Sequence, residues 1–355
     1  MDQARAKTFA TRMSGAYVEA MVTLMVDLGY RTGLFDALAT GPATSAELAE
    51  RTDLSERHVR EWLGSIAGAG ITDYDADTGR HTLPPEHAMF LCGDSPTNLA
   101  ASAGMITSLA PHVGEVARTF REGGGLPYAV YRPEFTTVMD QSGRRKYTNL
   151  LVSHYLPLAE GLPARLEQGA RALDLGCGTG HTTNLLAGAF PTSTFLGVDI
   201  ADDAITLARA EAERLDLDNV DYALHDIRTI AEHDDRFAEP FDVVFGFDVI
   251  HDQVDPVGVL AGIRSSLADD GFFFCYDIAA HSALEDNLDN PRAALIYGIS
   301  TLHCMQVSLA HEGAGLGTAW GQELATEMFR DAGFSRVDIR PLDLDPMNQV
   351  YVCRP

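Results

Sequence analysis

The chain has 355 residues, 46% of them hydrophobic, which is enough to bury the core of one large or two moderate domains. Lys and Arg total 26 against 51 Asp and Glu, so the formal net charge of −25 repels nucleic acid at long range and disfavours it as a partner. The five cysteines, at positions 92, 177, 275, 304 and 353, form no CxxC pair, which predicts neither a disulfide framework nor a structural zinc site.

The first apolar segment, 16–28, is interrupted by Glu19 and Asp27 and has no basic stretch before it. It is therefore predicted to be neither a signal peptide nor a membrane span. We expect the protein in the cytoplasm, without a membrane partner.

Residues 1–90 are predicted to form a winged-helix domain. An apolar helical period runs over 18–38, and 45–55 has the pattern of a short helix, a turn and a new N-cap. A second helix is predicted over 56–69. The run 71–83 then alternates around a turn, as the two-stranded wing of such a domain does.

The charges of this domain bear on its role, because winged helices bind DNA, dimerise or cover a substrate, and the fold alone does not decide between these. The second helix carries Arg57 and Arg60, but also Glu56 and Glu61, whereas phosphate contacts need a basic face. We therefore expect a domain that dimerises and helps to close a pocket, with DNA binding as the alternative.

Residues 91–168 are predicted to be a mostly helical connector, and from 169 to 355 short apolar strands alternate with helices. Strands are expected near 171–175, 194–198, 219–224, 241–247 and 270–278, and helices near 179–189, 202–215 and 255–268. After an insertion at 279–320, a helix at 322–332 and two closing runs, 337–340 and 348–353, predict a final antiparallel hairpin. The fold class is thus α/β, a doubly wound, mostly parallel sheet of seven strands behind a helical winged domain.

The run 171–181 contains a buried strand that breaks into a glycine turn and opens a helix. Gly176, Gly178 and Gly180 permit positive φ angles and let a ligand approach the backbone. A dinucleotide-binding turn would place its third glycine three positions after the second, but here it comes two after. The next strand ends at Asp199, where a parallel sheet presents a carboxylate to a ribose diol. These features together predict a nucleoside site.

The spacing Asp-x-Gly-x-Gly-x-Gly resembles motif I of class I S-adenosylmethionine-dependent methyltransferases. From the winged helix through Phe247-Asp-Val-Ile-His-Asp252 to Asn287-Leu-Asp-Asn-Pro291 and His303-Cys-Met305, the chain resembles winged-helix members of that class, the mycobacterial Rv2258c-like group. The resemblance implies S-adenosylmethionine as cofactor and S-adenosylhomocysteine as product. The cofactor-binding residues that it implies are Asp174, Gly176, Cys177, Gly178, Gly180, Asp199, Ile200, Asp226, Ile227, Phe247 and Asp248.

His251 follows the fourth strand, with Asp252 and Asp255 nearby, where a general base acting on a hydroxyl, thiol or amine is expected. The segment resembles the His-Asp-Trp segment of winged-helix O-methyltransferases, whose histidine is the catalytic base. This chain has glutamine at the third position, Gln253. The alternative is that His251 only caps the next helix.

The acceptor side has weaker candidates: Tyr128, Tyr131, His154, His303, Met305 and Trp320, any of which could instead be ordinary packing residues. A divalent metal could use Asp248, Asp277 and Asn287, but their spacing does not demand one, so no metal is predicted. We expect a homodimer that transfers a methyl group to a heteroatom, oxygen, of a small molecule. The alternative function is a DNA-binding transcriptional regulator that senses the cofactor.

Overall fold

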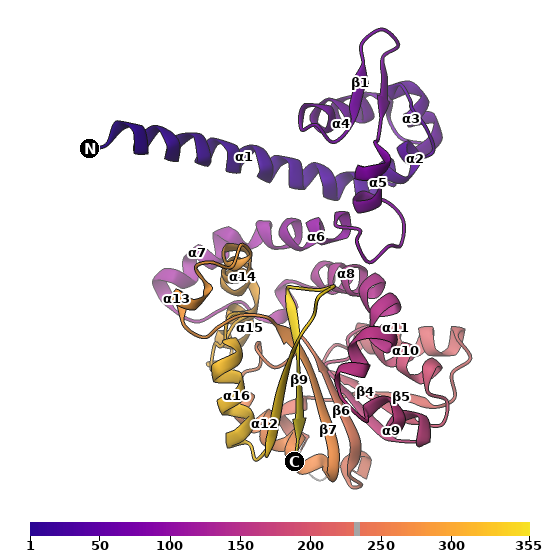
Figure 1. Cartoon of the computed structure of the whole chain (residues 1–355), viewed down its shortest axis with the longest axis vertical. Coiled ribbons are helices and arrows are strands. Elements are labelled where there is room, and N and C mark those ends of the chain that lie inside the picture. The colour runs from indigo at the N-terminus through magenta and orange to yellow at the C-terminus, as the bar shows by residue number, and fades with distance from the viewer. Residues whose placement is uncertain (231–234) are drawn as a thin grey trace. The chain divides into compact units, whose positions relative to one another are not determined.

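The computed structural model describes residues 1–230 and 235–355, which divide into two compact units, Met1–Ala110 and Pro111–Pro355 (Figure 1). The boundary falls inside the expected connector 91–168. Helix α6 (Ala100–Leu109) packs against α1 (Gln3–Arg31) within the first unit, whereas the rest of the connector belongs to the second. The connector is therefore divided between the two units.

The first unit is helical and carries a small two-stranded wing. Its elements are α1 (Gln3–Arg31), α2 (Leu34–Ala39), α3 (Ser45–Thr52), α4 (Glu56–Gly68), β1 (Asp73–Asp75), β2 (Arg80–Thr82), α5 (Pro85–Leu91) and α6 (Ala100–Leu109). β1 and β2 pair antiparallel, with Asp73 opposite Thr82. Thr44 and Glu47 form a capping box, which explains why α3 begins at Ser45. The predicted winged helix is confirmed.

Trp62 on α4 holds the core of this unit together. Its ring packs edge-on against Phe35 at a centroid distance of 5.1 Å, and its indole N–H donates to the carbonyl of Met25 at 2.9 Å. A Cβ atom at Gly29 would lie 2.6 Å from both rings, so α1 can approach them only with glycine at this position. In the described parts of the chain, no helix combines the length and the apolar character that crossing a bilayer requires.

The second unit is built on one sheet of seven strands. They are β3 (Arg171–Leu175), β4 (Thr194–Asp199), β5 (Val220–Leu224), β6 (Phe241–Phe247), β7 (Leu267–Ile278), β8 (Arg336–Pro341) and β9 (Asn348–Arg354). Their order is β5-β4-β3-β6-β7-β9-β8, in which β9 is antiparallel to both neighbours and the five strands from β3 to β7 are parallel. The predicted doubly wound sheet and closing hairpin are confirmed.

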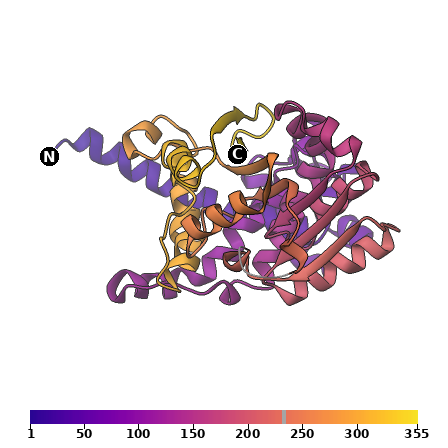
Figure 2. The ribbon, with the colours of Figure 1, turned by 90° about the horizontal axis from the view of Figure 1, so that it is seen from below.

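Helices cover both faces of this sheet (Figures 1 and 2). The unit contains α7 (Val113–Glu122), α8 (Glu134–Leu150), α9 (Leu162–Gln168), α10 (His181–Ala189), α11 (Asp202–Arg214), α12 (Pro256–Ser266), α13 (Leu284–Asn287), α14 (Ala293–Ile299), α15 (Met305–Leu309) and α16 (Gly321–Asp331). One core joins α9 and α10 to the sheet, and the other joins α12 and α16 to it.

Strand β7 shows how the two faces are separated. Phe274 and Tyr276 belong to the core beneath α9 and α10, while Phe273 and Cys275 belong to the core beneath α12 and α16. Side chains alternate along a strand, so Asp277 shares the second face. The chain order reverses between β3 and β6, and ligands of open α/β sheets bind at the carboxyl ends of strands at such a point.

Candidate functional site

The turn between β3 and α10 contains three glycines with positive φ: 62° at Gly176, 54° at Gly178 and 74° at Gly180. A Cβ atom at Gly176 would lie 2.5 Å from Val249 Cγ2, and one at Gly180 would lie 2.7 Å from the Tyr222 hydroxyl. Gly178 differs, because a Cβ atom there would meet no other residue within 4 Å. The turn therefore packs tightly at its two ends and leaves open space in the middle.

Asp199 ends β4 beside this turn. Its Oδ2 accepts a hydrogen bond from the Gly178 N–H at 2.9 Å, and its Oδ1 accepts one from the Ala201 N–H at 2.8 Å. Burial raises the pKa of this carboxyl, while the two backbone donors lower it. An ionised carboxylate offers about four acceptor positions, so two remain for a ligand. The next side chain, Ile200, is 59% exposed.

Asp174 and Cys177 support the turn from inside. Asp174 is buried, and its Oδ2 accepts from the Thr183 hydroxyl at 2.5 Å, whereas its Oδ1 is buried with no partner. Burial raises the pKa of Asp174 to about 7. The Cys177 N–H donates to the Val198 carbonyl at 3.0 Å, which ties the turn to β4. Both residues therefore hold the shape of the turn.

Asp226 and Ile227 follow β5. Asp226 is half-buried and accepts from the Arg228 guanidinium at 2.9 Å, a bond that holds the pKa of this carboxyl below its usual value. Ile227 is only 4% exposed and packs into the core beneath α12. Asp226 thus remains at the strand end, while Ile227 contributes to the core.

Phe247 and Asp248 lie where β6 ends. The Phe247 ring is half-buried and packs edge-on against Tyr147 of α8, with centroids 5.4 Å apart. Asp248 has a φ of 53°, and its Oδ1 accepts from Asn348 Nδ2 at 2.8 Å. Burial raises the pKa of Asp248 to about 7, although the charge of Lys146 lowers it.

His251 and Asp277 form a buried pair at the same edge of the sheet. The distance between His251 Nδ1 and Asp277 Oδ1 is 2.6 Å, and the side chains are only 4% and 0% exposed. Burial by itself lowers the pKa of His251, but the charge of Asp277 and its hydrogen bond raise it well above the usual value. A carboxylate on Nδ1 fixes the ring and leaves Nε2 to exchange a proton. Such an arrangement would allow His251 to act as a general base.

A π-helical turn, Ser300–Cys304, joins α14 to α15 within the insertion and brings two side chains to this pair. The Cys304 thiol hydrogen-bonds to His251 and lies 3.5 Å from His303 Nδ1. Both residues are buried, and His303 Nε2 has no partner among the described residues. Burial lowers the pKa of His303 to about 3, so its ring is neutral. Single π-helical turns within helices are frequent at functional sites.

Aromatic rings surround His303. Phe135 of α8 stacks on it with centroids 3.8 Å apart, and the rings of Tyr131 and Tyr128 meet it edge-on at 4.6 and 6.0 Å. The Tyr131 hydroxyl donates to the Leu302 carbonyl at 2.7 Å, which anchors the π-helical turn. The structure therefore brings Tyr128, Tyr131 and His303 together, and Cys304 links His303 to His251.

Three other acceptor candidates lie differently. His154 is exposed and bonds to the neighbouring Ser153 hydroxyl at 2.7 Å. Trp320 is buried in the core beneath α16, with its ring centroid 6.0 Å from that of Phe329. Met305 is half-buried beside Gly317. The structure does not bring His154 to the site.

Asp248, His251 and Asp277 could also hold a cation, because their ligand atoms all lie within 4.8 Å of one another. Asn287 is not part of this group. Its amide donates to the carbonyls of His281 and Ala283 at 2.7 and 3.0 Å. Of the three metal-ligand candidates considered from the sequence, Asp248 and Asp277 thus lie together, and His251 takes the place expected for Asn287.

Sequence reasoning did not assign a role to Lys146, Phe135 or Cys304, and considered Asp277 only as a metal ligand. Asp277 had a usable signal, because it follows the strand next to that of His251 in a parallel sheet. The other three come from helices whose docking the sequence pattern does not reveal.

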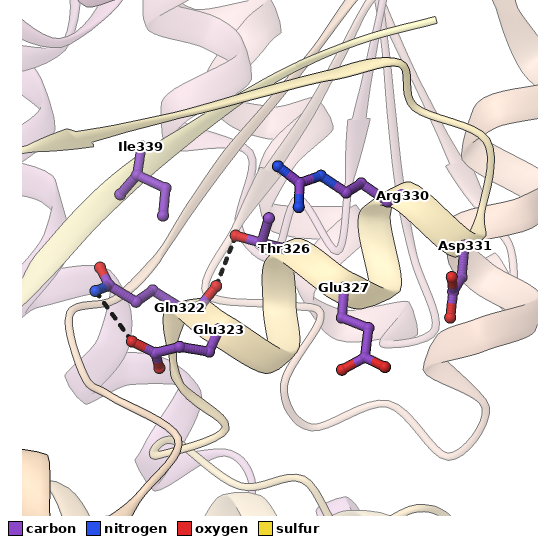
Figure 3. A pocket seen from close by; sticks show the side chains of 7 residues that line it. All are labelled: Gln322, Glu323, Thr326, Glu327, Arg330, Asp331 and Ile339. Atoms are coloured by element: carbon purple, nitrogen blue, oxygen red, sulfur yellow. Dashed lines mark hydrogen bonds between the residues drawn. The ribbon is translucent and has the colours of Figure 1, made fainter.

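A separate surface hollow of about 460 Å³ lies along α16 and faces β8 (Figure 3). Glu323, Glu327, Arg330 and Asp331 give it a charged lining. The Thr326 hydroxyl donates to the Gln322 carbonyl within it at 2.7 Å. None of its lining residues belongs to the glycine turn or to the His251 pair.

Two family models match the chain. Residues 20–93 match the Rv2258c-like winged HTH domain, and residues 166–333 match a methyltransferase domain. The chain joins an Rv2258c-like winged HTH domain to a methyltransferase domain. The methyltransferase domain includes the glycine turn, Asp199, His251, Asp277 and the π-helical turn.

Solved structures share this two-part fold. An O-methyltransferase family protein from Burkholderia thailandensis superposes with a TM-score of 0.68 at 18% identity, over 98% of this chain and 97% of that one. Human N-acetylserotonin methyltransferase in complex with SAM gives a TM-score of 0.70 at 16% identity, over 97% of each chain.

A curated relative matches a smaller part of the chain. The ubiquinone biosynthesis O-methyltransferase of Actinobacillus pleuropneumoniae is 30% identical over 107 residues, or 30% of this chain. The matched segment spans 44% of that relative's length.

Proposed function

We propose that this protein transfers a methyl group from S-adenosylmethionine to an oxygen atom of a small molecule. The observation that carries the proposal is the buried hydrogen bond of 2.6 Å between His251 and Asp277, at the strand edge that also holds the glycine turn. A nucleoside-type turn and a base at one sheet edge are the two parts that such a reaction needs.

The residues present fit the donor. The open space at Gly178 and the remaining acceptor positions of Asp199 suit a ribose, and the site is acidic overall. Asp248 and Asp252 each interact electrostatically with both His251 and Asp277. When bound, S-adenosylmethionine supplies an electrophilic methyl group on a sulfonium, whose positive charge suits this acidic site. The structure of human N-acetylserotonin methyltransferase, which contains SAM, supports the same donor.

The chain's own residues would orient the acceptor and remove its proton. His251 Nε2 accepts the proton of the attacking hydroxyl, and Asp277 stabilises the imidazolium that forms. The Cys304 thiol now occupies a hydrogen-bonding position on the same imidazole, so the acceptor hydroxyl takes its place there. The rings of Tyr128, Tyr131 and Phe135 shield the pair from water on the side of His303.

Calorimetry with S-adenosylhomocysteine, followed by transfer of a labelled methyl group to a panel of small phenols, alcohols and amines, tests this proposal. We expect wild-type binding and activity, and an inactive His251→Ala variant that still binds S-adenosylhomocysteine. His154→Ala, at an exposed histidine, is the matched control and should keep full activity. Failure of the wild-type protein to bind S-adenosylhomocysteine would contradict the proposal.

The winged HTH match raises DNA binding as the second candidate function. In α4, however, Arg57 pairs with Glu61, and Arg60 pairs with Glu56 at 2.8 Å, so the helix has little free positive charge. We propose that this domain mediates homodimerisation instead, because α1 exposes Phe9, Tyr17 and Met21 to 55% or more. A dimer by light scattering, together with no mobility shift of DNA at low salt, is the expected result.

A further inference from the structure

Lys146 on α8 is a half-buried cation that the reaction described above does not use. Its ammonium lies 3.0 Å from Asp345 Oδ2 and donates to the Tyr276 hydroxyl. The rings of Tyr147 and Tyr276 flank it at 5.2 and 4.9 Å from their centroids. An ammonium has three N–H donors, so these two partners leave one donor for a ligand.

Helix α8 is fixed against the glycine turn. The Thr179 hydroxyl donates to Asp140 at 2.6 Å, and the Thr148 hydroxyl lies 2.9 Å from His181 Nε2. Between these contacts, Arg144 binds Glu211 at 2.6 Å. Asp140, Arg144 and Thr148 are spaced by four residues and share one face of α8. Lys146 comes two residues after Arg144, so it lies on the other face of α8, where it reaches Tyr276 at the end of β7.

Asp248 brings a negative charge to the same place. Its N–H donates to the Tyr276 carbonyl at 2.8 Å, and the next residue, Val249, packs on Gly176 of the turn. The charge of Lys146 lowers the pKa of Asp248. Among the described residues, however, the ion pair of Lys146 is with Asp345 and not with Asp248. A cation and an anion therefore lie beside the turn, each with hydrogen-bonding capacity that the protein leaves unused.

We propose that Lys146 and Asp248 form the subsite for the amino-acid end of the donor, with Lys146 binding its carboxylate and Asp248 its ammonium group. This inference rests on the proposed function, which supplies the donor. A zwitterion carries one charge of each sign, and the pair matches it.

Two arginines near the turn also carry ion pairs. Arg132 is bound to Asp203, and Arg144 is bound to both Asp140 and Glu211. Lys146 differs from them because its partner, Asp345, is shared with the Tyr276 hydroxyl. Lys146 acts on the charge of Asp248, whereas Arg132, whose buried Nε has no partner among the described residues, acts on that of Asp199.

Calorimetry with two ligands tests the subsite. S-adenosylhomocysteine carries the amino-acid end, whereas 5′-methylthioadenosine has the same nucleoside and a thioether sulfur but lacks it. Lys146→Met should weaken S-adenosylhomocysteine binding by about 10- to 100-fold, as expected for a lost charge-assisted hydrogen bond. It should change 5′-methylthioadenosine binding by less than about 2-fold, because the contacts to the nucleoside remain.

Asp345→Asn is the matched control, since it removes the same ion pair but keeps the ammonium. It should retain S-adenosylhomocysteine binding. If Lys146→Met does not fold, the double variant Lys146→Met with Asp345→Asn leaves no unpaired charge and carries the same expectation. Equal losses for both ligands, or an unchanged affinity for S-adenosylhomocysteine, would overturn the subsite alone. A wild-type protein that binds neither ligand would overturn the proposed function and the subsite with it.

Discussion

Replacing Asp277 by asparagine removes the negative charge beside His251 while preserving the size of the side chain. The two side chains are 0% and 4% exposed and 2.6 Å apart, so solvent and salt screen their interaction very little. A positioned general base typically accelerates a reaction by about 10²- to 10⁴-fold. We therefore expect the plateau value of kcat/KM for Asp277→Asn, reached where His251 is unprotonated in both proteins, to fall by a factor in that range, or about 3 to 5 kcal/mol of activation free energy.

The pH profile shows whether this loss acts through His251. A base works only when unprotonated, and Asp277 raises the pKa of His251 well above 6.5, so the wild-type rate should climb until the pH exceeds that raised pKa. Removing the charge lowers the pKa of His251. The rising limb of Asp277→Asn should therefore lie at lower pH and reach a lower plateau.

Labelled-methyl transfer between about pH 5 and pH 10, with His154→Ala as the control, measures both quantities. A limb that stays at the wild-type pH would refute the reasoning, even if the rate falls. A variant with wild-type activity throughout would remove Asp277 from the mechanism.

Gly178→Ala should weaken S-adenosylhomocysteine binding. Gly180→Ala, whose Cβ would lie 2.5 Å from Ala208 Cβ, should lower the melting temperature more than Gly178→Ala does. Comparable effects of both changes on stability and binding would contradict this. Folding raises the pKa of Asp174 from 3.8 to about 7, so the folded state binds this proton more tightly than the unfolded state does. The contribution of this proton to the free energy of unfolding is complete below pH 3.8 and is lost as the pH rises through 7. Asp174→Asn should therefore raise the free energy of unfolding at about pH 8 by up to about 4 kcal/mol, and barely change it near about pH 4, in urea titrations. EDTA should leave methyl transfer unchanged; a loss that Mg²⁺ restores would instead assign a cation to Asp248, His251 and Asp277.

The sequence was most informative where strands end. Alternating apolar runs predicted β3, β4 and β6 to within a residue, and parallel strands bring their carboxyl ends to one edge. Gly178, Asp199 and His251 could therefore be placed together before any coordinates were known. The end of a strand can be predicted in this way because the apolar pattern that marks a strand involves only residues close together in the sequence.

Residues from helices and from the insertion could not be placed in this way. Trp320 and Ile227 pack into the core. The sequence around a single aromatic or aliphatic residue does not reveal whether its side chain is buried in the core or lines a binding site. His303 depends on a π-helical turn, whose hydrogen bonds differ from those of an α-helix without a sequence rule to mark them. Lys146 depends on how α8 docks, which long-range contacts decide.

The position of β9 affects how the protein is made. β9 follows β8 in the chain but is inserted between β7 and β8, where it pairs Gln349 with Asp277. During synthesis, the partner of His251 therefore stays on an open sheet edge until residue 354 has left the ribosome. Unpaired edges of this kind invite aggregation, so a ribosome that stalls before residue 348 would release a chain prone to aggregate. The sheet edge that holds Asp277 is therefore completed only after β9 has been synthesised.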